Sequence, residues 1–211
     1  MTARPDPMAL VLHAVRILGF AAPSRIADRV GLDLASAAEA LGDAEAYGWA
    51  THAAFAGLEG WSLTDAGRAE GERRLAVELA ASGGEAEIRA VHREFLPLNA
   101  RLQAAVTDWQ LRPAEGDPLA GNDHADAAWD ARVLDELDRI GRELGPLVAR
   151  LRRVLDRFAG YDARFDAARA RARAGDGSWV DRTDRDSCHR VWFELHEDLL
   201  ATLGLARGRE A

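Results

Sequence analysis

The chain has 211 residues, of which 48% are hydrophobic and 29% are charged. This composition supplies an ordinary hydrophobic core and excludes a largely disordered chain. The 35 acidic residues outnumber the 27 basic residues, all of which are arginine, so the formal net charge is -8. A general attraction to nucleic acid or to anionic membranes is therefore not a property of the whole chain.

The first 20 residues contain an apolar run that His13 and Arg16 interrupt. This pattern fits neither a secretory signal peptide nor a membrane span. Cys188 is the one cysteine in the sequence, which excludes an intramolecular disulfide and a zinc site made only of thiolates. We therefore expect a cytoplasmic protein with no membrane attachment.

Residues 1–83 are predicted to form helices and one β-hairpin. Apolar residues recur at helical spacing in residues 8–19, and Ser24 and Asp33 have the positions of N-caps for two further helices. Residues 49–52 and 60–64 have the pattern of two short strands around a glycine-containing loop. A last helix is predicted from residue 65 to a Ser-Gly-Gly break at 82–84, which we take as a domain boundary.

Residues 84–211 have helical spacing and no strand pattern. The predicted helices cover residues 85–111, 123–141, 146–159, 161–174 and 186–203. Pro97 is expected to kink the first of these helices, and Gly145-Pro146 is expected to separate the second from the third. Residues 112–122 and 175–184 are predicted to be loops.

The order helix, helix-turn-helix, hairpin, helix in the first part comes with a set of local sequence patterns. They are Ile26-Ala27, Arg29-Val30-Gly31-Leu32, Asp33, Leu41, Glu45-Ala46, Gly48-Trp49-Ala50 and the segment from Trp61 to Arg68. With these patterns the first part resembles bacterial transcriptional regulators of the MarR type. The resemblance implies a winged helix-turn-helix, in which the helix from Leu34 to Tyr47 enters the major groove and residues 53–59 form the wing. The DNA-binding residues that it implies are Arg25, Arg29, Leu34, Ser36, Ala38, Glu39 and Arg68.

The charge of this first part favours a second interpretation. Residues 1–83 contain seven arginines and eleven acidic residues, a balance of -4. No cation lies between Leu34 and Tyr47 or in the predicted wing, although neutralised phosphates supply most of the affinity for DNA. The alternative is a winged helix that binds a protein partner and not DNA.

The second part is also similar to known sequences. The segments 95–99, 107–113, 122–130, 157–165 and 191–204 resemble a helical region of bacterial proteins. Some of those proteins are regulators, and others are fused to enzymes like pyruvate phosphate dikinase. The resemblance implies that these segments belong to one pocket or interface, and it assigns no catalytic residue.

The last predicted helix places His189, Trp192 and His196 on one face, at helical spacing. We predict that they face inward and help to line a pocket for a small effector. The ligand-binding residues of this prediction are Trp109, Gln110, His124, Trp129, His189, Trp192 and His196. The alternative is plain core packing.

A metal site within this helix is not expected. His189 and His196 are seven residues apart, or about 10.5 Å along a helix axis, so they cannot share a metal ion, and His92 or His124 would have to come from another helix. The arginines of residues 150–173 are predicted to form a solvated face or, alternatively, to bind an anion. No spacing typical of a catalytic site is present, and no cofactor is expected.

The sequence therefore predicts a mainly α protein with two domains. Residues 1–83 form a winged helix-turn-helix with a small β-hairpin wing, and residues 84–211 form an all-α bundle for effector sensing and dimerisation. The expected function is that of a homodimeric, DNA-binding transcriptional regulator that is not an enzyme. The alternatives are a winged-helix interaction or sensor protein that does not bind DNA and, less favoured, a helical metal-dependent enzyme.

Overall fold

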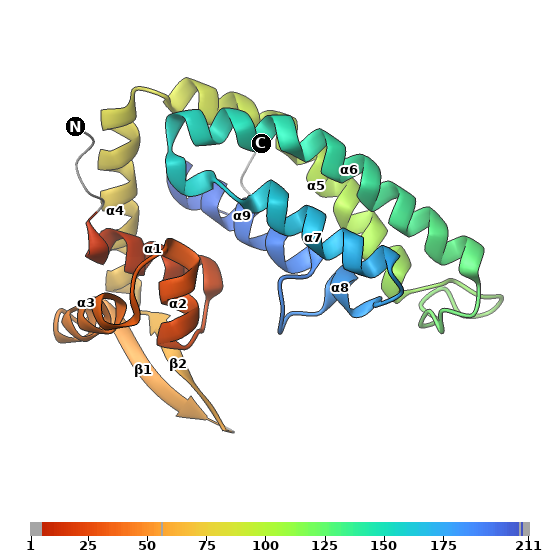
Figure 1. Ribbon diagram of the computed structural model, residues 1–211, viewed down its shortest axis with the longest axis horizontal. Helices are drawn as coiled ribbons and strands as arrows, with labels where there is room; N and C mark the ends of the chain where they lie inside the picture. The colour runs from red at the N-terminus through yellow and green to blue at the C-terminus, as the bar shows by residue number, and fades with distance from the viewer. Residues whose placement is uncertain (1–5, 56, 207, 209–211) are drawn as a thin grey trace. The chain divides into compact units, whose positions relative to one another are not determined.

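A computed structural model of the chain describes residues 6–55, 57–206 and 208. It is mainly helical, with one sheet of two antiparallel strands, β1 and β2, among the described residues (Figure 1). The expectation of a mainly α protein is thus confirmed. In the part of the chain that the structure describes, no helix combines the length and the apolar character that crossing a bilayer requires.

The chain divides into two compact units. We call residues 1–83 together with 197–211 the N-terminal unit, and residues 84–196 the helical unit. The first division falls inside the predicted Ser-Gly-Gly break. The second falls within the last helix, so the end of the chain joins the N-terminal unit, whereas the sequence grouped it with the second part.

The N-terminal unit begins with three helices, a hairpin and a fourth helix. These elements are α1 (Pro7–Leu18), α2 (Pro23–Val30), α3 (Leu34–Ala46), β1 (Ala50–Phe55), β2 (Leu58–Leu63) and α4 (Asp65–Ser82). The side chains of Asp6, Asp33 and Thr64 accept hydrogen bonds from backbone N–H groups in the first turns of α1, α3 and α4. These three helices therefore start at a side-chain cap. Helix α2 has none: its N-cap is Ala22 and Ser24 lies inside the helix, so the prediction of Ser24 as a cap is wrong.

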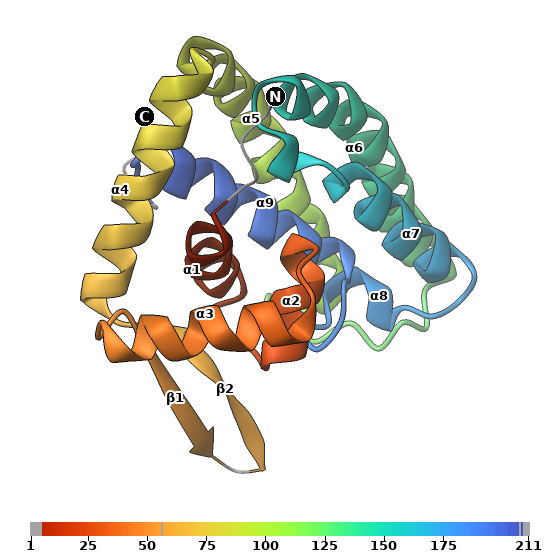
Figure 2. The ribbon, with the colours of Figure 1, turned by 60° about the vertical axis from the view of Figure 1, so that its left-hand side comes forward.

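Helix α1 is the centre of this unit, because α2, α3 and α4 all pack against it (Figure 2). Its Val11 and Leu12 are fully buried, as are Ile26 of α2 and Leu41 of α3. The strands pair from Ala50 with Leu63 to Phe55 with Leu58, so the hairpin is longer than predicted. Ala56, at the tip of the predicted wing, lies outside the described residues.

The end of the last helix, α9 (Cys188–Leu203), belongs to the same unit. Nε2 of His13 on α1 lies 3.2 Å from Oδ1 of Asp198 on α9, and both side chains are buried. Arg16 donates a hydrogen bond to Glu197 at 2.6 Å and another to Glu72 of α4 at 2.9 Å. These pairs explain why residues far apart in sequence form one unit.

The helical unit contains two long helices that lie side by side and run in opposite directions (Figure 1). Its elements are α5 (Glu85–Gln110), α6 (Ala127–Val154), a 3-10 turn η1 (Asp156–Phe158), α7 (Tyr161–Arg173), α8 (Ser178–Asp181) and the first part of α9. Fully buried aromatic rings of Phe158, Tyr161 and Phe165 form part of its core.

Three local predictions for this unit are wrong. The helix predicted from residue 123 begins at Ala127, where Asp126 is the N-cap. Helix α6 is continuous across Gly145-Pro146, because Leu144, Leu147 and Val148 are all buried on the same side of the helix, and their packing outweighs the missing hydrogen bond of the proline. The predicted loop 175–184 contains the short helix α8, whose Val180 is fully buried.

Candidate ligand pocket and the exposed face of α3

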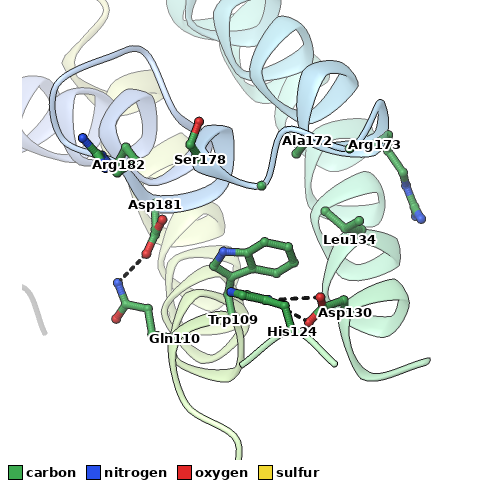
Figure 3. Close-up of a pocket in the computed structure, with 12 residues that line it drawn as sticks. Trp109, Gln110, His124, Asp130, Leu134, Ala172, Arg173, Ser178, Asp181 and Arg182 are labelled. Carbon is green, nitrogen blue, oxygen red and sulfur yellow. Dashed lines mark hydrogen bonds and ion pairs between the residues drawn. The ribbon is translucent and has the colours of Figure 1, made fainter. Parts of the chain in front are cut away.

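A pocket of about 570 Å³ opens in the helical unit where α5 ends, α6 begins and α7 passes into α8 (Figure 3). This volume is in the range of pockets that hold small organic ligands. The lining residues are Trp109, Gln110, His124, Asp130, Leu134, Ala172, Arg173, Gly175, Gly177, Ser178, Asp181 and Arg182. Three residues that the sequence predicted for a ligand site, Trp109, Gln110 and His124, therefore lie together.

His124 is held in place by both its backbone and its side chain. Its φ of 58° is in the left-handed region, which non-glycine residues seldom adopt. Its backbone N–H donates to Oδ1 of Asn122, and its Nδ1 lies 3.0 Å from Oδ2 of Asp130. Asn122 also donates to Asp130 at 3.0 Å. Such backbone strain is often found where a side chain must be placed for function.

Trp109 is 8% exposed, and its indole lies between Asp181 and Asp130 (Figure 3). The ring of His124 tilts against it, with 4.5 Å between ring centroids. The backbone at Gly177 also approaches the Trp109 ring so closely that a Cβ atom there would lie 2.7 Å from it. Glycine at 177 is therefore required for this ring position.

A second polar pair lies at the other side of Trp109 (Figure 3). Nε2 of Gln110 donates to Oδ2 of Asp181 on α8 at 2.8 Å. His189 of α9 is near this carboxylate. Burial lowers the pKa of His189, and Asp181 opposes that shift. The lowered pKa favours the neutral imidazole of His189 beside Asp181.

The two arginines of the lining are paired with acidic residues outside it. Arg173 donates to Asp138 at 2.8 Å and also pairs with Asp135. Arg182 pairs with Asp184 at 3.1 Å, and this carboxylate is the main reason that the pKa of Arg182 is raised. The hydrogen bonds of both guanidinium groups are thus directed to partners that do not line the pocket.

Trp192 and His196 do not line this pocket. Trp192 is 2% exposed and stacks on Phe95 of α5 with 4.7 Å between ring centroids. His196 is 3% exposed, and its ring lies 5.4 Å from that of Phe95 and 6.5 Å from that of His92. These side chains are part of the packed core of the helical unit, which is the alternative that the sequence left open.

Trp129 also does not line this pocket but a different cleft. Its indole N–H donates to the backbone carbonyl of Asp108 at 2.6 Å, and Arg132 stacks on its ring. It lines a smaller cleft of about 220 Å³ together with residues of α5 and α6, including Arg101 and Glu136. His189, another of the seven predicted ligand residues, does not line the pocket but lies near Asp181, which does.

Several lining residues were not predicted as ligand residues from the sequence. Asp130 was expected to pair with Arg132 or with a neighbouring helix, and Ser178, Asp181 and Arg182 were assigned to a loop. The glycine-containing segment 175–178 between two helices could have indicated this part of the pocket, since glycines often mark a close approach of the backbone to a ring or ligand.

The exposed face of α3 has few polar groups suited to anions. Leu34 is 55% exposed, and Ala38, Glu39 and Asp43 are also exposed, whereas Ala37, Leu41 and Ala44 face the core. Asp33 caps the helix by accepting hydrogen bonds from the backbone N–H and the hydroxyl of Ser36, which lower the pKa of its carboxyl and keep it charged. A carboxylate thus occupies the helix end that normally attracts phosphate.

The arginines that the resemblance assigns to DNA lie on the neighbouring helices. Arg25 is exposed on α2, Arg29 is partly buried one turn later, and Arg68 is exposed in the first turn of α4. In the hairpin, Nε2 of His52 lies 3.0 Å from Glu59. The cations of this surface therefore come from α2 and α4.

Four of the eight arginines of residues 150–173, namely Arg150, Arg164, Arg169 and Arg173, pair with acidic side chains of the helical unit. Arg150 donates to Glu87 and Glu94 of α5, each at 2.7 Å. Arg164 pairs with Asp186 and with the buried carboxylate of Glu194, which raises its pKa. These contacts fit ion pairs that join helices better than a free anion site.

Among the described residues, no group of three or more His, Cys, Asp and Glu side chains is placed to hold a metal ion. The thiol of Cys188 is buried, and burial raises its pKa to about 12, so it is not an activated nucleophile. Comparison of the chain with protein-family models, with curated proteins and with solved structures gives no match in any of the three.

Proposed function

We propose that the protein is a transcriptional regulator that binds double-stranded DNA through its N-terminal unit and a small effector through its helical unit. The observation that supports DNA binding best is the order α2, a short turn at residues 31–33, α3 and the hairpin β1–β2. The outer side of α3 is open to solvent. In a winged helix-turn-helix, the second helix of such a pair enters the major groove and the hairpin lies beside the backbone.

In this proposal, α3 approaches DNA through small side chains. Ala35, Ala38 and Gly42 are exposed and allow the helix backbone to come close to the base edges. Glu39 is suited to accept a hydrogen bond from a cytosine amino group. Arg25 and Arg68 contact phosphates, because they are exposed on α2 and α4.

The effector signal is transmitted through α9 in this proposal. Helix α9 starts in the helical unit, where His189 lies near Asp181 of the pocket. Its last residues belong to the N-terminal unit, where Asp198 contacts His13 of α1. Because α9 is one continuous helix, a ligand that shifts its start would also change the contact between Asp198 and His13.

The proposed regulator acts as a homodimer. Winged-helix dimers bind two half-sites about 34 Å apart, and an effector that changes the spacing of the two DNA-binding units changes their fit to both half-sites. Sedimentation velocity, with and without duplex DNA, tests this part of the proposal. A monomer that binds DNA with one half-site would contradict it.

A second candidate function is supported by the surface of α3 itself. This face combines exposed Leu34 with Glu39 and Asp43, it has no arginine, and the charged Asp33 lies at its start. An apolar and acidic surface of this kind suits a protein partner with basic residues better than it suits phosphate. The second candidate is therefore an interaction module that keeps the same fold.

Fluorescence anisotropy separates the two candidates. A labelled duplex from the protein's own promoter region is titrated with the protein over a salt series, and the first candidate predicts a linear fall of log K with log salt. Arg25→Ala and Arg68→Ala should each lower the salt slope by about 1. Arg153→Ala, which removes an exposed arginine of the helical unit, is the matched control and should leave the slope unchanged. Absence of binding at low salt favours the interaction module.

A further inference from the structure

The pocket of the helical unit contains two carboxylates whose hydrogen-bond partners carry no permanent charge. Asp130 accepts hydrogen bonds from the amide of Asn122 and contacts the imidazole of His124. Asp181 accepts from the amide of Gln110. Among the described residues, neither carboxylate lies within ion-pair distance of an arginine, and burial lowers the pKa of His189 beside Asp181.

The hydrogen bonds of the lining arginines are made to other carboxylates, although Arg182 also attracts Asp181 from a longer distance. Arg173 is held by Asp135 and Asp138, and Arg182 by Asp184, none of which lines the pocket. Only 17% of the Asp130 side chain is exposed. A partly buried carboxylate without a cationic partner is costly, and a bound cation removes that cost.

The remaining walls of the pocket are apolar or aromatic. Leu134 and Ala172 come from α6 and α7, and the indole of Trp109 lies between Asp130 and Asp181 (Figure 3). An indole attracts a cation more strongly than any other aromatic side chain does. A carboxylate at each side of an indole, with an aliphatic wall, is an arrangement that selects for positive charge on an apolar body.

We propose that this pocket binds an organic cation: a protonated primary amine on a compact apolar or aromatic body. The amine is placed against Asp130 or Asp181, and the apolar body lies against Trp109, Leu134 and Ala172. This inference rests on the proposed function, because it names the chemical class of the effector. The pocket volume of about 570 Å³ leaves room for a molecule larger than a simple alkylamine.

Isothermal titration calorimetry with three molecules of similar shape tests the proposal. The probes are phenethylamine, 2-phenylethanol and 3-phenylpropanoate, which are positive, neutral and negative at neutral pH. A set of further primary amines with aliphatic and bicyclic bodies extends the series, each with its matching alcohol. We expect the amines to bind at least about tenfold more tightly than the alcohols, or about 1.4 kcal/mol, and the carboxylate to bind least.

Two variants place the binding in the pocket. At least one of Asp181→Asn and Asp130→Asn, the variant that removes the carboxylate holding the amine, should weaken amine binding about tenfold and leave the weak binding of the alcohols unchanged. Glu115→Gln, in the exposed loop between α5 and α6, is the matched control and should leave amine binding unchanged. Circular dichroism checks that each variant is folded. Because the two aspartates lie on different helices, α6 and α8, the second variant serves as the test if the first is destabilised.

Several outcomes would overturn the proposal. They are tighter binding of the carboxylate than of the amine, equal binding of all three probes, absence of binding throughout the amine series, and amine binding that neither aspartate variant weakens. The calorimetry contains no DNA, and the anisotropy titration contains no amine. Failure of the amine proposal is therefore distinguishable from failure of DNA binding.

Discussion

The indole N–H of Trp192 donates a hydrogen bond to Oδ1 of Asn99 at 3.0 Å in the core of the helical unit. Trp192 lies on α9 and Asn99 on α5, so this bond joins the last helix to the first helix of the unit. The ring is stacked on Phe95 and also contacts Phe165 of α7. Trp192 thus connects three helices, and this role explains its burial without any ligand.

We therefore expect Trp192→Ala to lower the free energy of unfolding by about 3–5 kcal/mol, as is usual for the truncation of a buried aromatic ring. The adjacent Phe193 is 39% exposed, and Phe193→Ala is the matched control, with an expected loss of about 1 kcal/mol. Urea denaturation followed by circular dichroism measures both values. Similar losses for the two variants would contradict the core position of Trp192.

Two glycines of α4 should respond oppositely to the same substitution. A Cβ at Gly67 would lie 1.8 Å from the backbone carbonyl oxygen of Trp49, whereas the nearest atom to a Cβ at Gly71 is 3.9 Å away. Gly67→Ala should cost about 3 kcal/mol, since backbone must move. Gly71→Ala should add up to about 1 kcal/mol, because alanine favours a helix. Thermal melts of both variants check this, and equal melting temperatures would refute it.

Glu70 should make the stability of the N-terminal unit depend on acidity. A hydrogen bond from Arg73, with a further one from Arg74, lowers the pKa of Glu70 from 4.5 to about 2. Since the carboxylate is favoured in the folded state, its contribution is complete above pH 4.5 and is lost as the pH falls toward about 2. Glu70→Gln should reduce the loss of stability over this range, as measured by urea denaturation at several pH values. Glu45→Gln, on the exposed side of α3, should retain the wild-type slope, and a Glu70→Gln slope equal to it would exclude this role.

Cys188 should be unreactive in the folded protein. Burial raises the pKa of its thiol from 9.0 to about 12, so almost no thiolate is present at pH 8, and the side chain is fully buried. A coloured disulfide reagent at pH 8 should therefore react with the thiol only after guanidinium is added. Glu115→Cys provides an exposed thiol as the positive control. Rapid reaction of the native wild-type chain would show that α9 opens in solution.

Local rules predicted most helix ends of the N-terminal unit. Asp33 is both the expected and the observed cap of α3, and Gly31 ends α2 in the left-handed conformation. These features depend on residues a few positions apart, which a sequence displays directly. The helix break expected at Gly145-Pro146 is wrong because a local rule does not include tertiary packing: Leu144 and Leu147 are buried, and this packing keeps α6 continuous.

The candidate pocket was predictable only in part. Trp109, Gln110 and His124 were predicted and lie together, because they are close in sequence around the turn from α5 to α6. Asp181 joins them through a hydrogen bond between residues 71 positions apart. Periodicity placed His189, Trp192 and His196 on one face, yet it does not show which neighbour that face meets.

The sequence by itself determined the mainly helical composition, the hairpin and the break near Gly83, because these follow from the spacing of apolar residues, caps and glycines along the chain. Tertiary structure alone decided that Trp192 packs on Phe95 and that the end of α9 joins α1 through Asp198 and His13. It also decided that Asp130 and Asp181 face one cavity. Helical spacing fixes the direction of a side chain relative to its own helix, and only the packing of helices against each other fixes what that side chain contacts.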